Sequence, residues 1–355
     1  MPSSVLTRTG VSAPAARPSV SPSRPDSILA ALTPTETADF LPEPLASEVR
    51  ALALRHTTYD PLGHSAEAFH RALHEANPEI LVAAWKTPAL PAVLPPRLRY
   101  VCYLCGSVKK LITRDHLERG LIVTNWGGSI SRIVAEWALF HILSCLRRAT
   151  AWALAMHLEG GWKDGATETA SLFGRTVGLH GFGQVARELV RLLAPFGVRI
   201  SVLAPDVDAA TETAFGIHRS PSIERLFSDN DIIVELAPLI PETVGMVTEH
   251  HLRLIRPGGV FINVGRGAVV DEAALLRVAA EGKIQVGLDV FTQEPLPKDS
   301  GFRGLRNVTL TPHLAGPTTD RRRDAGGFAV ANLRAYAHGE PLQAVVTPHV
   351  YDQSS

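Results

Sequence analysis

The stretch that decides the fold is Thr176-Val-Gly-Leu-His-Gly-Phe-Gly-Gln-Val-Ala186, which continues as Arg187-Glu-Leu-Val-Arg-Leu-Leu-Ala-Pro-Phe-Gly197. An apolar run that turns at glycines into a helical pattern predicts a strand, a tight turn and a helix. The spacing Gly181-x-Gly183-x-x-Ala186 suits a dinucleotide. The first glycine permits the turn, the second lets the backbone approach a pyrophosphate, and the alanine lets helix pack on strand. Such turns also arise from packing alone, so the rest of the chain must decide.

The residues around this stretch repeat the alternation of strand and helix. We predict six strands in this unit, at residues 176–180, 199–203, 231–236, 259–264, 286–290 and 308–311. Upstream, a second parallel sheet is predicted, with strands at 28–32, 79–85, 99–104 and 121–124 and a helix over 66–76. Alternating strands and helices of this kind indicate an α/β fold with two doubly wound, Rossmann-like or flavodoxin-like sheets.

A long apolar helix is predicted over about residues 133–157, between the two units. After Pro312, a helix over 319–337 and a short tail are expected to pack back on the first unit. We therefore predict a disordered extension over 1–26, a discontinuous first domain over 27–148 plus 318–355, and a Rossmann domain over 149–317.

The composition limits the class of partner. Lysine plus arginine equals aspartate plus glutamate at 35 each, so no net charge draws the molecule to nucleic acid or to an anionic membrane. The longest apolar stretch, Trp137 to Cys145, is too short to span a bilayer. Three cysteines make no disulfide framework and indicate a reducing compartment, by default the cytoplasm. We expect a small-molecule partner, with no nucleic acid and no membrane.

Two segments allow more than one interpretation. The first 26 residues are rich in Ser, Pro, Ala and Arg, which predicts disorder, although a transit peptide is an alternative because arginines occur without acids until Asp26. The pair Cys102-x-x-Cys105 could indicate redox chemistry or half of a zinc site. It lies in an apolar strand pattern, so we favour structural burial and predict no metal site.

Three polar side chains follow strands of the second unit. Arg266, Glu294 and His313 come after the predicted strands 259–264, 286–290 and 308–311. Ligands of open parallel sheets bind outside the carboxyl ends of strands, so we expect these groups to converge. An arginine can hold a carboxylate bidentately, and an imidazole beside a carboxylate can exchange a hydroxyl proton. Beside a nicotinamide, they would suit interconversion of a 2-hydroxy acid and a 2-oxo acid.

At these residues the chain resembles the D-isomer-specific 2-hydroxyacid dehydrogenases. The motifs that follow the glycine turn occur in the family's order: Pro238-x-x-Pro-Glu-Thr243, Asn263-x-x-Arg-Gly-x-x-Val-Asp271, Asp289-Val-x-x-x-Glu-Pro295 and Thr311-Pro-His313. The resemblance covers nearly everything from about residue 28 onward. It implies two similar domains with a cleft between them, the first binding substrate and closed by the C-terminal helix.

The resemblance also implies roles for single residues. Arg266 would be the substrate-binding arginine, His313 the acid–base and Glu294 its partner, while backbone N–H groups at Gly106 and Ser107 would bind the substrate carboxylate. Lys109 and Lys110 follow that loop and are expected to be surface residues. The predicted cofactor contacts are Gly181, Gly183, Gln184, Val185, Pro205, Asp206, Pro238, Thr243, Gly265 and Asp289, the last at the nicotinamide end.

The chain departs from the family pattern at two positions. The acid that usually bonds the adenosine ribose is replaced by Ala204, before Pro205, and Asp206 or Asp208 could substitute for it. No Arg or Lys lies between Ser201 and Thr211 to pair with a 2′-phosphate, so NAD is favoured over NADP. Leu236 stands where relatives often have histidine near the cofactor.

The leading hypothesis is an NAD-dependent D-2-hydroxyacid dehydrogenase that works mainly as a 2-oxo acid reductase. The alternative is a dinucleotide-sensing binding protein or corepressor of the same fold without significant turnover, because fold does not settle function. Formate oxidation is disfavoured because such enzymes carry glutamine where Glu294 stands, whereas phosphite oxidation stays open. Relatives are commonly dimers joined through the helix around Val134, so a homodimer is predicted.

Overall fold

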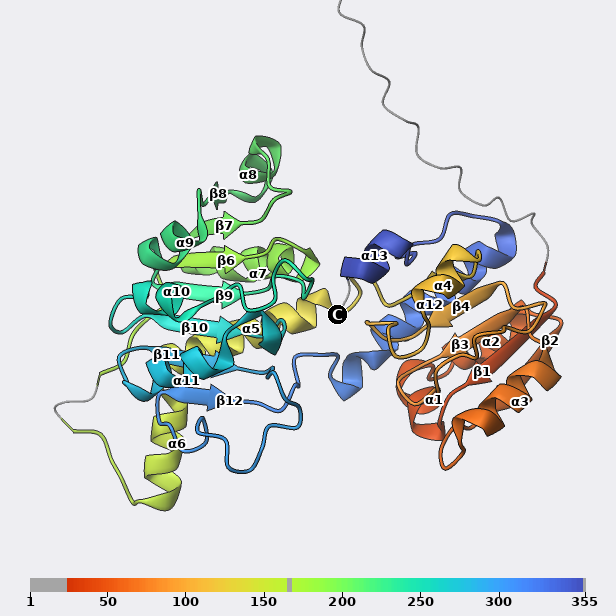
Figure 1. Ribbon diagram of the computed structural model, residues 1–355, viewed down its shortest axis with the longest axis horizontal. Coiled ribbons are helices and arrows are strands. Elements are labelled where there is room, and N and C mark those ends of the chain that lie inside the picture. Colours follow the sequence, from red (N-terminus) through yellow and green to blue (C-terminus); the bar gives the residue numbers. More distant parts are fainter. Residues whose placement is uncertain (1–23, 165–167, 354–355) are drawn as a thin grey trace, which may run out of the picture.

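The computed structural model describes residues 24–164 and 168–353 as two α/β units lying side by side. Helix α5 (Ser131–Leu146) and the segment leading to α12 (Arg322–His338) connect them (Figure 1). The expected extension over 1–26 lies outside the described residues except for 24–26, where Arg24 donates hydrogen bonds to the carbonyls of Ala51 and Ala53. In the described ranges no helix is long and apolar enough to cross a membrane.

The first unit contains a parallel sheet in the order β2-β1-β3-β4-β5. Its strands are β1 (Ser27–Ala31), β2 (Arg55–Tyr59), β3 (Ile80–Ala83), β4 (Tyr100–Tyr103) and β5 (Ile122–Thr124). Strands β1, β3 and β4 are buried throughout, as expected for a parallel sheet with helices on both faces. The prediction missed β2, because this edge strand is polar and mostly exposed.

Helices cover both faces of this sheet: α1 (Pro34–Phe40), α2 (Leu45–Leu52), α3 (Ala66–Ala76), α4 (Arg114–Glu118), α12 and α13 (Pro348–Gln353). The last two come from the C-terminal segment and pack on the first unit. Val330, Leu333 and Tyr336 of α12 are buried in the first core, and Tyr336 stacks on Tyr100 of β4.

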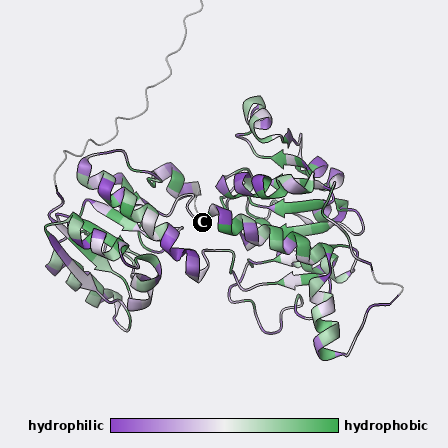
Figure 2. Cartoon of the chain, turned by 180° about the vertical axis from the view of Figure 1, so that it is seen from behind, coloured by the Kyte–Doolittle hydropathy of each residue, from purple (hydrophilic) through white to green (hydrophobic). Residues whose placement is uncertain are grey.

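The second unit contains a seven-stranded parallel sheet in the order β12-β11-β10-β9-β6-β7-β8. Its strands are β6 (Thr176–His180), β7 (Arg199–Leu203), β8 (His218–Arg219), β9 (Ile232–Glu235), β10 (Val260–Asn263), β11 (Gln285–Leu288) and β12 (Val308–Leu310). The central strands are hydrophobic (Figure 2). The six predicted strands are confirmed, and the additional β8 is a two-residue exposed edge strand.

The strand order reverses between β6 and β9, because the chain builds β7 and β8 on one side of β6 and then crosses to the other. This reversal is the switch point at which doubly wound sheets bind ligands, beyond the carboxyl ends of the strands. The helices of this unit are α6 (Ala149–Leu158), α7 (Gln184–Leu193), α8 (Ala209–Phe215), α9 (Ile223–Asp229), α10 (Glu249–Leu254) and α11 (Glu272–Ala280), together with α5.

The long helix expected over 133–157 is two helices, α5 and α6. Arg148 between them has a left-handed backbone with φ +53°, which interrupts the helical hydrogen bonding. The buried side chains of α5, among them Ala138 and Ile142, join the core of the second unit and pack against α7, β10 and β11. This placement differs from the predicted division at 148/149, which assigned the helix to the first domain.

Candidate active site

The glycine turn between β6 and α7 leaves space for a ligand. Gly181 has φ +93°, and a Cβ there would lie 2.8 Å from the Ala237 nitrogen and the Leu236 oxygen, so only glycine fits. Gly183 has φ −75°, and a Cβ there would meet no described atom within 4 Å. Neither its backbone nor protein packing therefore explains a glycine at 183. The open space would admit a pyrophosphate close to the backbone, beside the N–H groups at the start of α7.

The other predicted cofactor residues follow neighbouring strands of the sheet. Pro205 and Asp206 are exposed after β7, and Pro238 is exposed after β9. Thr243 closes the loop that begins at Pro238, because its hydroxyl accepts from the Ile240 N–H at 3.0 Å and donates to the Pro238 carbonyl at 2.5 Å. Gly265 follows β10. All of these residues lie beyond the carboxyl ends of strands.

Two contacts fix the loop that carries Arg266. The buried Asn263 side chain accepts from the Gly265 N–H and donates to the Arg266 carbonyl, each at 3.1 Å. A Cβ at Gly267 would lie 2.1 Å from the carbonyl carbon of Phe291, so this loop packs directly on the backbone that leads to Glu294. Asn263 belongs to the motif Asn263-x-x-Arg266, but no role was predicted for it.

The Arg266 side chain is half-buried, and its Nη1 donates to the Gly265 carbonyl at 2.8 Å. Burial lowers the pKa of its guanidinium, and the nearby Glu294 carboxylate opposes that shift. The guanidinium is therefore a partly desolvated cation close to an anion, and a partly desolvated cation binds a ligand carboxylate more strongly than a fully hydrated one does.

His313 and Glu294 form the second part of the site. Their Nδ1 and Oε2 atoms are 2.7 Å apart, and the other carboxylate oxygen accepts from the Phe291 N–H at 3.0 Å. The two side chains are 50% and 36% exposed, so a ligand can reach them. With Nδ1 bonded to the carboxylate, Nε2 lies on the opposite edge of the ring. The structure thus brings together Arg266, Glu294 and His313 as predicted.

Asp289 lies beneath the His313 loop. Its carboxylate is fully buried and accepts hydrogen bonds from Leu314 N at 2.8 Å, Ala315 N at 2.9 Å, Thr311 Oγ1 at 2.6 Å and Trp137 Nε1 at 3.1 Å. Its backbone carbonyl also accepts from the His313 N–H. This environment differs from the predicted contact to a nicotinamide. It holds the left-handed backbone of His313, φ +54°, in place.

The predicted substrate loop follows β4 of the first unit. A Cβ at Gly106 would lie 2.8 Å from the Trp126 indole, and the Asn125 amide donates to the Gly106 carbonyl at 2.9 Å. Trp126 in turn meets Trp85 edge to face, with ring centroids 6.0 Å apart. Gly106 and Ser107 are therefore half-buried beside an aromatic wall.

Lys109 and Lys110 are exposed, as predicted, and the Lys109 ammonium lies 5.7 Å from the Tyr351 ring centroid on α13. Cys102 and Cys105 are buried free thiols, and burial raises the pKa of Cys102 to about 11. A thiol that stays protonated is a poor nucleophile and metal ligand. These observations support the structural interpretation of the cysteine pair.

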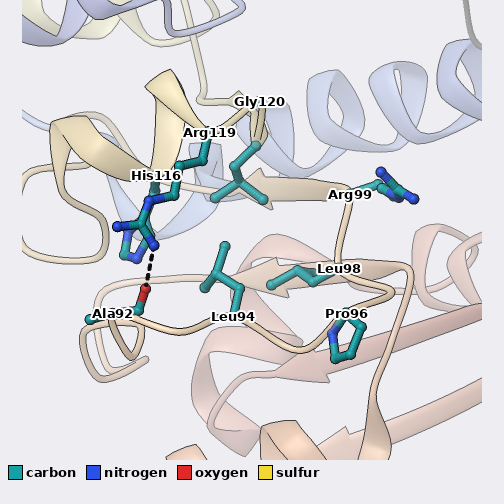
Figure 3. Close-up of a pocket in the computed structure, with 9 residues that line it drawn as sticks. Ala92, Leu94, Pro96, Leu98, Arg99, His116, Arg119 and Gly120 are labelled. Atoms are coloured by element: carbon teal, nitrogen blue, oxygen red, sulfur yellow. Dashed lines mark hydrogen bonds between the residues drawn. The ribbon is translucent and has the colours of Figure 1, made fainter.

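A separate pocket of about 220 Å³ lies in the first unit, between the segments that precede β4 and β5 (Figure 3). Leu94, Pro96 and Leu98 line it, and Arg119 donates to the Ala92 carbonyl at its rim. Because its residues precede the strands, it lies at the opposite edge of the sheet from Gly106, and it contains none of the predicted site residues.

Comparison with known proteins agrees with this geometry. The family model "D-isomer specific 2-hydroxyacid dehydrogenase, NAD binding domain" matches residues 139–315. A glyoxylate reductase of Korarchaeum cryptofilum is 32% identical over 250 residues, which are 69% of this chain and 75% of that protein. The chain belongs to the D-isomer specific 2-hydroxyacid dehydrogenases.

Further relatives cover more of this dehydrogenase. Glyoxylate/hydroxypyruvate reductase B of Pectobacterium carotovorum is 31% identical over 312 residues, 86% of this chain and 96% of that one. The crystal structure of an NADPH-dependent glyoxylate/hydroxypyruvate reductase from Sinorhizobium meliloti, in complex with citrate, has a TM-score of 0.70 at 25% identity. The match covers 91% of this chain and 98% of that one. These similarities support the predicted enzyme over the predicted sensor or corepressor.

Proposed function

We propose that this dehydrogenase reduces small 2-oxo acids to D-2-hydroxy acids, with Arg266, Glu294 and His313 as its catalytic group. The observation that carries the proposal is the 2.7 Å His313–Glu294 pair, whose carboxylate also acts on the half-buried Arg266 guanidinium. The group lies on the same edge of the sheet as the open space over Gly183. The relatives named glyoxylate reductase support a small substrate.

Each residue of the group has a distinct task in reduction. The Arg266 guanidinium binds the substrate carboxylate and polarises the adjacent carbonyl, and the N–H groups of Gly106 and Ser107 bind the same carboxylate from the first unit. Glu294 stabilises the imidazolium of His313, which donates the Nε2 proton to the carbonyl oxygen. The nicotinamide, when bound, supplies the hydride. In this proposal the first unit binds substrate and the second binds the dinucleotide.

We further propose that NAD is preferred over NADP. Ala204 is buried directly after β7. The exposed residues among 205–210 include Asp206 and contain no Lys or Arg. An acid near this position favours a ribose hydroxyl, whereas a 2′-phosphate needs a basic partner. The Sinorhizobium relative is named NADPH-dependent, so both cofactors belong in the test. Three buried free thiols suit a reducing cytoplasm, which we include in the proposal.

The proposal is tested by following NADH and NADPH oxidation with purified protein and a panel of 2-oxo acids: glyoxylate, hydroxypyruvate, pyruvate and a bulky aryl-substituted acid. Turnover of at least one small acid is expected, with a higher kcat/KM for NADH. The His313→Ala variant is the negative control, because it lacks the proposed proton donor. Tight NADH binding without turnover on any acid would contradict the enzymatic proposal and favour the sensor.

We also propose that the protein forms a homodimer through the α5–α6 surface. Helix α6 is apolar but contributes no fully buried residue. The exposed large apolar residues are Met156 and Leu158 on α6, Phe140 on α5 and Trp162 just after α6. Large apolar side chains exposed along neighbouring segments of the chain support an interface. Leu158 is 75% exposed, so Leu158→Glu should leave the fold intact.

Light scattering after size exclusion is expected to give a dimer for the parent protein and a monomer for Leu158→Glu. The control is Leu62→Glu, which changes an equally apolar and 66% exposed residue of the first unit. A parent protein that elutes as a monomer would contradict the proposed interface. So would a Leu158→Glu variant that remains a dimer, whatever the state of Leu62→Glu.

A further inference from the structure

A buried ionisable pair lies at the switch point of the seven-stranded sheet. His180 is the last residue of β6 and Glu235 the last of β9, and the two are register partners in these neighbouring strands. Their side chains are almost fully buried, with relative exposures of 4% and 0% for the two residues. The Nδ1 and Oε2 atoms are 2.6 Å apart. The pair therefore lies where the strand order reverses, directly below the glycine turn.

Burial lowers the pKa of His180, but the Glu235 charge and hydrogen bond outweigh it, so the pKa is raised overall. The Glu235 carboxylate thus favours the protonated form of His180 in this interior hydrogen bond. Buried ion pairs usually contribute little more to stability than well-packed apolar side chains would. A role in positioning explains the pair better than a role in stability does.

Glu235 also holds the backbone that follows β9. Its Oε1 accepts from the Ala237 N–H at 2.8 Å, while the Leu236 N–H donates to the His180 carbonyl at 2.9 Å. The short segment 236–237 is therefore tied to both members of the pair. Because His180 occupies Oε2, the carboxylate is oriented with Oε1 toward Ala237.

The segment 236–237 packs closely against two loops of the candidate site. On one side a Cβ at Gly181 would lie 2.8 Å from Ala237 N. On the other, a Cβ at Gly265 would lie 3.1 Å from the Glu235 carbonyl and 3.4 Å from Leu236 Cα. A displacement of this segment would therefore move the glycine turn, the Gly265–Arg266 loop or both.

We propose that His180 and Glu235 are positioning residues for the dinucleotide, which hold segment 236–237 so that the glycine turn and the Gly265–Arg266 loop after β10 keep the spacing of the cofactor crevice. The inference rests on the proposed dinucleotide binding. Neither side chain needs to touch the cofactor. The consequence is a loss of cofactor affinity, rather than of the chemical step, when the pair is removed.

The test measures NADH affinity by fluorescence titration and the apo-protein Tm for two variants. The double variant His180→Leu with Glu235→Leu removes the pair without leaving an unpaired charge, but takes away the acceptor of the Ala237 N–H. Its Kd for NADH is expected to rise about tenfold with an unchanged or higher Tm. Glu235→Gln keeps both hydrogen bonds, with neutral His180 accepting at Nδ1, and is expected to bind NADH within about twofold of the parent.

The control is Thr176→Val, which removes a hydroxyl bonded to Asp231 at the opposite end of β6 and should leave the Kd unchanged. If the double variant does not fold, Glu235→Ala makes the same comparison with one substitution. The inference would be overturned if the folded double variant, or Glu235→Ala in its place, bound NADH with unchanged affinity. It would also be overturned if Glu235→Gln and Thr176→Val lost as much NADH affinity as that variant. A parent protein that binds neither NADH nor NADPH would instead overturn the proposed function.

Discussion

Replacing His313 by alanine is expected to lower kcat for 2-oxo acid reduction by roughly two to four orders of magnitude while the Kd for NADH stays unchanged. The imidazole is the group whose Nε2 faces away from Glu294 and can give a proton to the substrate oxygen. The alanine variant keeps the backbone N–H that donates to the Asp289 carbonyl, so the loop retains its anchor. Steady-state kinetics together with NADH titration measure both quantities.

Glu294→Gln is the matched variant for this experiment. The amide can still bond to His313 and to the Phe291 N–H, but it no longer stabilises the imidazolium. The pH at which reduction declines should therefore move to lower values, with a smaller loss at low pH than in His313→Ala. Normal turnover of His313→Ala would remove the histidine from the mechanism, and an unmoved pH profile would leave Glu294 with a structural role only.

Replacing Arg266 by lysine is expected to raise KM for the 2-oxo acid about ten- to hundredfold, with a smaller fall in kcat. The guanidinium is half-buried near Glu294, and its planar fork can bind a carboxylate through two hydrogen bonds. An ammonium keeps the charge but offers no such fork. The loop itself is held through the backbone by Asn263, so the substitution should not displace it.

Arg277→Lys is the control for Arg266, because it makes the same substitution in an exposed arginine that pairs with Glu249. Its kinetic constants should match those of the parent protein. Unchanged substrate saturation in Arg266→Lys would refute the proposed role in binding. A parallel rise in the Kd for NADH would instead indicate that the side chain supports the cofactor crevice.

Much of the fold was predictable because parallel strands buried on both faces appear in the sequence as continuous apolar runs. The strands β6 and β7 match the predicted ranges residue for residue. The polar β2 and the two-residue β8 carry no such run and were missed. The break at Arg148 was also missed, because a left-handed backbone at an arginine has no local sequence signal.

The proximity of Arg266, Glu294 and His313 was predictable because each of them follows a strand of the same sheet. The residues that hold these three side chains in place were not predictable. Trp137 meets Asp289 across 152 positions of sequence, and His180 meets Glu235 across 55. Periodicity within one element contains no information on such pairs. The environment of Asp289 could not be predicted either. A carboxylate after a strand gives the same sequence pattern whether it faces a ligand or supports a loop.

All three cysteines of the chain lie in its described part, and all are buried. The native protein should therefore take up little maleimide, which makes it suitable for site-directed labelling without prior removal of cysteines. Cysteines introduced at Leu62 in the first unit and at Val244 in the second, 66% and 60% exposed in the parent protein, would each accept a dye. Energy transfer between the two dyes would then follow the separation of the units as dinucleotide and substrate are added.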